Sequence, residues 1–232
     1  MQICSVDVFE DFLNLLLPSN CILCATAGSN LCELCELELE IKVRKVSRHG
    51  ISGFAATTYS SQIAKLIHQF KEGQQTSLAK IFCKAMLPAL NNFELQNCSL
   101  VYMPSKSKSF ASRGFVPAKI IANGLSRQIA KRHKILVPVY GGLGFLPEAA
   151  KHIEDQAALS GKDRRTNLVG TMQVTGRSKQ NRAILIDDIV TTGATLIEAA
   201  RALEGIGVQV LGFVTFAETL PKNQQKRHAK SV

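Results

Sequence analysis

The spacing of apolar residues predicts helices and strands in alternation from about residue 50 onward. Apolar residues recur at helical spacing in the segments 59–69, 78–90, 115–132 and 195–203. Short apolar runs predict strands at 99–103, 135–140, 182–186 and 208–216. Strands that alternate with helices are typical of a mainly parallel sheet with helices on both faces. The pattern therefore predicts an α/β fold.

Two later stretches do not follow this pattern. Glycine, proline and charged residues interrupt it between residues 141 and 179, where we expect a long mobile loop. The stretch 222–232 has four Lys or Arg residues, no acidic residue and almost no apolar residue. Such a composition predicts a frayed basic tail.

The strongest chemical signal follows the predicted strand 182–186. Two carboxylates, Asp187 and Asp188, come directly after the apolar run, at the sheet edge where open α/β folds bind ligands. Hydroxyl-bearing and small residues follow them: Thr191, Thr192, Gly193, Ala194 and Thr195. Gly193 permits a positive φ, and the amides after Thr191 can form a concavity for a phosphate at a helix N-terminus.

We call residues 187–195 the phosphate segment. Two carboxylates beside a phosphate would repel it unless they faced another part of the ligand, such as sugar hydroxyls. A ribose 5-phosphate satisfies both halves of the segment. The alternative is a strand that ends in an aspartate turn followed by a threonine N-cap, with no ligand.

Four of the seven cysteines lie close together as Cys21-x2-Cys24-x7-Cys32-x2-Cys35. Two such pairs can converge on one tetrahedral ion, and zinc is the default metal. Four thiolates close the coordination shell, so the metal would be structural. An iron–sulfur cluster and four reduced thiols remain the alternatives.

Composition adds information about partners and compartment. Lys plus Arg (28) exceed Asp plus Glu (18), giving a net charge of +10. This sign fits phosphorylated small molecules, single-stranded DNA and RNA, and it also fits a merely solvated basic surface. The longest nearly uncharged apolar stretch, 135–147, is too short to cross a bilayer. Residues 1–12 are acidic and carry no Lys or Arg, unlike a secretory signal, so we expect a cytoplasmic protein.

The phosphate segment resembles the phosphoribosyl pyrophosphate (PRPP) binding motif of the type I phosphoribosyltransferases. Together with the four cysteines, it makes the chain similar to the ComF family of competence-associated, phosphoribosyltransferase-like proteins. Further matches are His68-Gln69-Phe70-Lys71-Glu72-Gly73, Arg113-Gly114-Phe115 after the Pro104 loop, Gln156-x2-Leu159-Ser160 and Arg164-x2-Asn167. The chain departs from the family pattern at Val116, where Asn is usual, and at Ile153-Glu154-Asp155, where a Thr is usual.

The resemblance implies that a nucleophile displaces pyrophosphate at the anomeric carbon of PRPP. Asp187 and Asp188 would then hold the ribose hydroxyls, with magnesium accompanying PRPP, and Lys106 would assist catalysis. The implied PRPP-binding residues are Asp187, Asp188, Thr191, Thr192, Gly193, Ala194, Thr195, Ser105 and Lys106. Arg113, Arg164 and Arg165 are second choices for the pyrophosphate, and each of these cations has the alternative of a solvated loop charge. None of His68, His133 and His152 qualifies as a general base on sequence alone.

The sequence thus predicts a four-cysteine zinc module (1–48), a phosphoribosyltransferase-like domain (49–220) and a basic tail (221–232). The leading hypothesis is a PRPP-binding transferase-like protein, and the resemblance links it to DNA uptake or nucleotide metabolism. The alternative is a non-catalytic module that senses PRPP or a nucleotide, or that binds single-stranded DNA.

Overall fold

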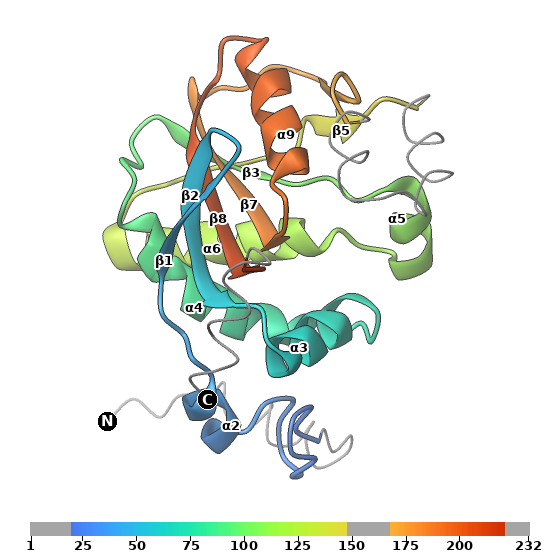
Figure 1. Ribbon diagram of the computed structural model, residues 1–232. Coiled ribbons are helices and arrows are strands. Elements are labelled where there is room, and N and C mark those ends of the chain that lie inside the picture. The colour runs from blue at the N-terminus through green and yellow to red at the C-terminus, as the bar shows by residue number, and fades with distance from the viewer. Residues whose placement is uncertain (1–19, 148–167, 221–232) are drawn as a thin grey trace.

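A computed structural model of the chain describes residues 20–147 and 168–220 (Figure 1). Within these residues the main sheet has six strands in the order β1-β2-β8-β7-β3-β4. The strands are β1 (Arg44–Arg48), β2 (Ile51–Thr58), β8 (Gln209–Glu218), β7 (Arg182–Val190), β3 (Cys98–Tyr102) and β4 (Val139–Tyr140). All neighbours pair parallel except β1 and β2, which pair antiparallel. The predicted mainly parallel sheet is therefore confirmed.

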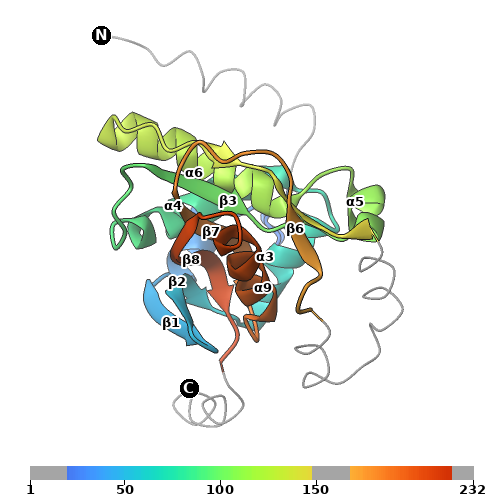
Figure 2. The same cartoon turned by 90° about the horizontal axis from the view of Figure 1, so that it is seen from above.

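Helices cover both faces of this sheet (Figure 2). One face carries α3 (Ser61–Lys71), α4 (Ala79–Leu90) and α6 (Pro117–His133), and the other carries α9 (Ala194–Glu204). Along β7, Ile184 and Ile186 pack into the cluster under α4 and α6, whereas Ala183 and Leu185 pack into the cluster under α9. A strand buried on both faces needs apolar residues at every position, which explains its unbroken apolar run.

The four predicted helices are present with ends shifted by a few residues, but several other elements differ from the prediction. Strand β7 continues four residues beyond Ile186, because residues 187–190 still pair with β8. Strand β4 has two residues rather than the six predicted at 135–140. A helix that we did not predict, α5 (Ser107–Arg113), lies in the Pro104 loop.

The beginning of the sheet was also missed. Strand β1 pairs with β2 from Arg44, so residues 44–48 lie in the main sheet although we assigned them to the N-terminal module. The division of the chain into separate folding units stays a prediction. The basic tail 221–232 lies outside the described residues.

The expected loop at 141–179 contains two short strands, at 143–145 and 172–174, so the prediction is wrong for these residues. Strands β5 (Leu143–Phe145) and β6 (Met172–Val174) pair antiparallel, on either side of residues 148–167, which the structure does not describe. Buried Glu198 of α9 accepts a hydrogen bond from the Met172 N–H at 2.9 Å, and Arg201 donates to the Met172 carbonyl. Although burial opposes its ionised form, hydrogen bonds from Arg201 lower the pKa of Glu198. This charged pair fastens β6 to α9.

The cysteine-bearing segment packs on α4. Its residues Cys21, Leu31, Cys35 and Leu39 belong to the same hydrophobic cluster as Phe82. The Asn30 side chain donates to Ser77 Oγ at 2.7 Å, and Glu36 of the short helix α2 (Glu33–Glu38) pairs with Lys84. The segment therefore shares the core of the domain rather than forming one of its own.

No helix in the described part of the chain combines the length and apolar character needed to cross a bilayer.

Candidate active site and metal centre

Strand β7 carries the acidic pair past the end of its neighbour β3. The last residue of β3, Tyr102, lies opposite Ile186, and residues 187–190 pair with β8 on their other side. Asp187 and Asp188 therefore lie in a strand, not after it, yet they stand at the carboxyl edge that the sequence predicted. This is the edge where parallel α/β sheets bind ligands.

The turn after β7 consists of Thr191, Thr192 and Gly193. Gly193 has a φ of +79°, a left-handed conformation that residues other than glycine rarely adopt. The Gly193 carbonyl accepts the first hydrogen bond of α9 from Ile197 N at 3.0 Å, and Thr192 Oγ1 accepts from Ala194 N at 3.4 Å. The turn thus leads directly into a helix N-terminus, where free N–H groups and the helix dipole favour an anion.

The two carboxylates have different partners. Asp188 is 3% exposed and pairs with Lys71 Nζ at 2.5 Å, while Asp187 Oδ1 accepts a hydrogen bond from the Asp188 N–H at 2.9 Å. Burial, and then the adjacent Asp188 charge, raise the pKa of Asp187 well above its ordinary value, although Lys71 acts in the opposite direction. Asp188 is therefore paired with a lysine, whereas the surroundings of Asp187 disfavour its charged form.

The raised pKa predicts how stability changes with pH. Because folded Asp187 holds its proton more tightly than the unfolded chain does, its contribution to stability is greatest below about pH 4 and is lost as the pH rises through the raised pKa. Asp187→Asn should remove this loss. Urea unfolding of the two proteins across neutral pH measures the difference, and parallel pH profiles would contradict the prediction.

Lys71 is a site residue that sequence reasoning did not select. It ends α3, and it belongs to the 68–73 motif quoted for the family resemblance, which was the available signal. The next residue, Glu72, accepts a hydrogen bond from Arg113 Nε at 3.1 Å, and this bond lowers the pKa of Glu72. The rings of Phe70 and Phe115 lie 6.3 Å apart. The 68–73 motif at the end of α3 thus contacts both the 113–115 motif and the acidic pair.

The remaining predicted site residues lie as follows. Ser105 and Lys106 are half-buried and follow β3, so they stand at the same sheet edge as the phosphate segment. Lys106 is the N-cap residue of α5, and its carbonyl accepts from Phe110 N. His68 and His133 are exposed. Arg164, Arg165, His152 and the 156–167 motif lie outside the described residues.

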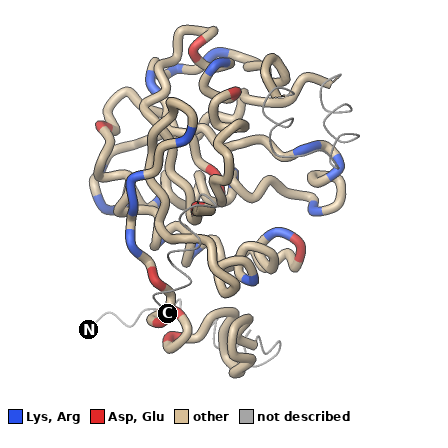
Figure 3. The backbone as a smooth tube through the Cα atoms, in the orientation of Figure 1, with Lys and Arg blue, Asp and Glu red and all other residues tan. Residues whose placement is uncertain are grey.

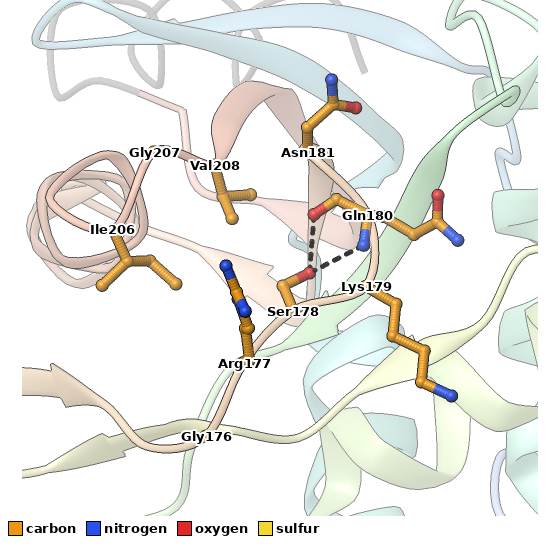
Figure 4. Close-up of a pocket in the computed structure, with 9 residues that line it drawn as sticks. All are labelled: Gly176, Arg177, Ser178, Lys179, Gln180, Asn181, Ile206, Gly207 and Val208. Atoms are coloured by element: carbon orange, nitrogen blue, oxygen red, sulfur yellow. Dashed lines mark hydrogen bonds between the residues drawn. The ribbon is translucent and has the colours of Figure 1, made fainter.

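A separate pocket of about 400 Å³ lies at the opposite edge of the sheet (Figure 4). Residues 176–181 and 206–208 line it, directly before the first residues of β7 and β8. Ser178 Oγ donates to the Gln180 carbonyl at 2.7 Å and accepts from the Gln180 N–H at 3.2 Å. Because it lies at the amino ends of the parallel strands, this pocket is distinct from the phosphate segment.

The four predicted metal ligands converge. The sulfur atoms of Cys21, Cys24, Cys32 and Cys35 all lie within 4.8 Å of one another, and those of Cys24 and Cys32 are 3.6 Å apart. Zinc–sulfur bonds of about 2.3 Å in a tetrahedron place the sulfurs roughly 3.8 Å apart, so the cluster fits one such ion. Although burial opposes ionisation, backbone hydrogen bonds from Cys32, Cys24 and Leu23 lower the pKa of Cys21 to about 6. Burial and the contacts with the other three thiols raise the pKa of Cys35, so the cluster without metal favours the thiolate form of Cys21 and disfavours that of Cys35. The thiolate is the form that binds metals.

Comparison with known proteins identifies the domain. Residues 109–232, more than half of the chain, match the family model described as "Phosphoribosyl transferase domain". The chain belongs to this phosphoribosyltransferase family. It is 28% identical to Competence protein F of Haemophilus influenzae over 65% of this chain and 66% of that protein. These two matches confirm that the chain is a ComF-like member of the family.

Shorter matches join the chain to other phosphoribosyltransferases. It is 39% identical to a hypoxanthine/guanine phosphoribosyltransferase of Methanosarcina mazei over 20% of this chain and 24% of that protein. The corresponding protein of Methanosarcina barkeri is 42% identical over 18% of this chain and 22% of its own length. The chain thus spans just under two thirds of Competence protein F and about a quarter of these enzymes. The phosphoribosyltransferase match includes the phosphate segment and Arg113 but begins after Lys71 and Lys106.

Proposed function

We propose that the protein binds PRPP and transfers its 5-phosphoribosyl group to an acceptor. The observation that carries this proposal is the junction of β7 and α9, where two carboxylates precede a left-handed Gly193 and a helix N-terminus. The 5-phosphate would bind the turn and the first residues of α9, from Thr191 to Thr195. Asp187 and Asp188 would hold the ribose hydroxyls, and the family membership supports this orientation.

The leaving pyrophosphate needs compensation of its negative charge. Ser105 and Lys106 follow β3, the strand next to β7, and would bind it from the adjacent position on the same edge. Bond breaking at the anomeric carbon leaves an oxocarbenium-like sugar, so stabilising the departing group matters more than activating the nucleophile. Asp187, Asp188 and Lys106 are therefore the residues to which we assign catalysis.

Magnesium fits the same site. Two adjacent carboxyl groups, one of them paired with Lys71, offer hard oxygen atoms of the kind that the ion prefers. Magnesium would enter with PRPP near Asp187 and Asp188 and would offset charge on the pyrophosphate.

We further propose that Cys21, Cys24, Cys32 and Cys35 bind one structural zinc ion. The convergence of the four sulfur atoms supports this assignment, and a complete set of thiolates leaves no position for a reacting water.

The test of the main proposal has two parts. Calorimetric titration should detect binding of PRPP with magnesium, and release of pyrophosphate should then appear with one member of a panel of purine, pyrimidine and amine acceptors. Absence of PRPP binding would refute the assignment of the site. Binding without turnover across the panel would favour a PRPP sensor instead.

A second candidate function is binding of single-stranded DNA, and the relative named for competence agrees with a role in DNA uptake. The feature that favours it is α5, in which Phe110 is 49% exposed and closely follows Lys106 and Lys108 in the sequence. Figure 3 shows further Lys and Arg positions along β1. Cations that alternate with an aromatic ring are typical of single-strand binding surfaces.

This candidate predicts weak binding to single-stranded DNA that decreases steeply as salt is raised, because each phosphate contact releases counterions. Fluorescence anisotropy with a labelled oligonucleotide measures the affinity at low and high salt. Deletion of residues 222–232, which contain four of the basic residues, should weaken binding. Affinity that is indifferent to salt would exclude the counterion-release account, and affinity that survives the deletion would exclude a role for the tail.

A further inference from the structure

Arg48, the last residue of β1, reaches the turn of the phosphate segment. Its Nε donates to the Thr191 carbonyl at 2.9 Å. Its Nη2 donates both to Glu218 Oε2 and to the Thr219 carbonyl at 2.9 Å, and its Nη1 donates to the Ser47 carbonyl at 3.0 Å. One side chain thus joins the turn to the end of β8.

The surroundings of Arg48 hold it in this place. Its side chain is 13% exposed and that of Glu218 is 9% exposed, so water competes little with their ion pair. A Cβ added to Gly193 would lie 2.6 Å from the Arg48 Cβ. The backbone of the turn therefore packs directly against Arg48. Every nitrogen of the guanidinium already donates to protein oxygen, so Arg48 does not itself need a ligand.

The hydrogen bond from Arg48 to the Thr191 carbonyl also fixes the direction of the next amide. In a trans peptide the C=O and the following N–H point in opposite directions. Because Arg48 holds the Thr191 carbonyl on its own side of the turn, the Thr192 N–H of the same peptide must point to the other side. An amide held in this way can donate to a phosphate without reorienting first.

We infer that Arg48 is a positioning residue, which fixes the Thr191–Thr192 peptide so that the Thr192 N–H is presented to the 5-phosphate. This inference rests on the proposed function, because it concerns how that same site holds its ligand. It assigns Arg48 to the 5-phosphate end of the ligand alone. The pyrophosphate end, which we place at Ser105 and Lys106, does not depend on it.

The experiment compares two probes, ribose 5-phosphate and magnesium pyrophosphate, by calorimetry. In Arg48→Gln the affinity for ribose 5-phosphate should fall about tenfold, as expected for one hydrogen-bonding amide out of position, while that for magnesium pyrophosphate should stay within about twofold. Arg48→Lys keeps the charge beside Glu218, but a single ammonium cannot reproduce the forked contacts, so it should show the same selective loss. Lys45→Gln, on the exposed face of β1, makes the same charge change as Arg48→Gln and should alter neither affinity.

The outcomes separate this inference from the proposed function. Equal loss of both probes in folded Arg48→Lys would show a general structural role and overturn the inference. Unchanged affinity for ribose 5-phosphate in either folded variant would also overturn it. Failure of the unaltered protein to bind ribose 5-phosphate would overturn the proposed function itself, and this inference with it.

Discussion

Replacing Asp187 and Asp188 together with asparagine should lower the affinity for PRPP with magnesium by on the order of a hundredfold or more. Asparagine keeps the shape and one carbonyl oxygen at each position but removes the charge of Asp188. It also removes the charge that Asp187, which holds its proton tightly in the free protein, would gain once PRPP and magnesium displaced that proton. Each charge-assisted hydrogen bond lost in this way costs about 1.5–3 kcal/mol. Calorimetric titration measures the affinity, and circular dichroism checks the fold.

Structure refines the interpretation of this variant. Asp188→Asn also removes the partner of Lys71, whereas Asp187→Asn replaces a carboxyl whose charge the fold already disfavours. The single variant at 187 should therefore fold at least as well as the unaltered protein at neutral pH. Thr192→Val is the matched control on the phosphate side: it deletes a hydroxyl, retains the backbone amide and should cost less affinity. A double variant that bound PRPP as tightly as the parent would exclude the ribose-holding role of these carboxylates.

Cys24→Ser should abolish metal binding, and the purified unaltered protein should contain about one zinc per chain. Structural zinc sites contribute folding free energy directly, so the variant should lose ordered structure around the cysteines. Elemental analysis measures the metal, and limited proteolysis locates the loss of structure. We expect cleavage within the first forty or so residues before the α/β domain is cut.

A matched control tests whether the metal is bound by the four-cysteine group in particular and not by other cysteines of the chain. Cys98→Ala removes a buried thiol of β3 that is not one of the four proposed zinc ligands, so this variant should retain the zinc. Because Leu31, Cys35 and Leu39 belong to the same hydrophobic cluster as Phe82, we expect the Cys24→Ser variant to lower the stability of the α4 region as well. Unaltered protein prepared without chelator and found free of metal would disprove the zinc assignment.

The sequence was most informative where a local pattern carried the structure. Strand β7 is buried on both faces, so its core gave an unbroken apolar run, and the turn chemistry of Thr191, Thr192 and Gly193 followed within a few residues. The strand's last residues escaped prediction because Asp187 and Asp188 end the apolar run. Only pairing with β8, such as Asp187 opposite Thr215, keeps them extended.

Other elements gave no periodic signal. Strand β1 buries only Val46 among five residues and is otherwise basic or polar, as is common for an edge strand. Helix α5 buries no residue at all, so no apolar spacing marks it.

The key side-chain contacts lie far apart in sequence. Arg48 and Thr191 are separated by 143 positions, and Lys71 meets Asp188 across a similar span. No local pattern can predict such a pair, because only the tertiary packing of helices and strands brings its members together.

The sheet order also has a consequence for how the chain folds. Strand β8 follows every other strand of the main sheet along the chain, yet it lies between β2 and β7. During synthesis, the β1–β2 hairpin and the β7–β3–β4 portion therefore cannot join until Gln209–Glu218 has left the ribosome. Parallel pairing across such long separations is slow, because loop-closure entropy is lost before the contacts form. Until then both strand edges are open to pairing with other chains, which exposes the nascent protein to aggregation.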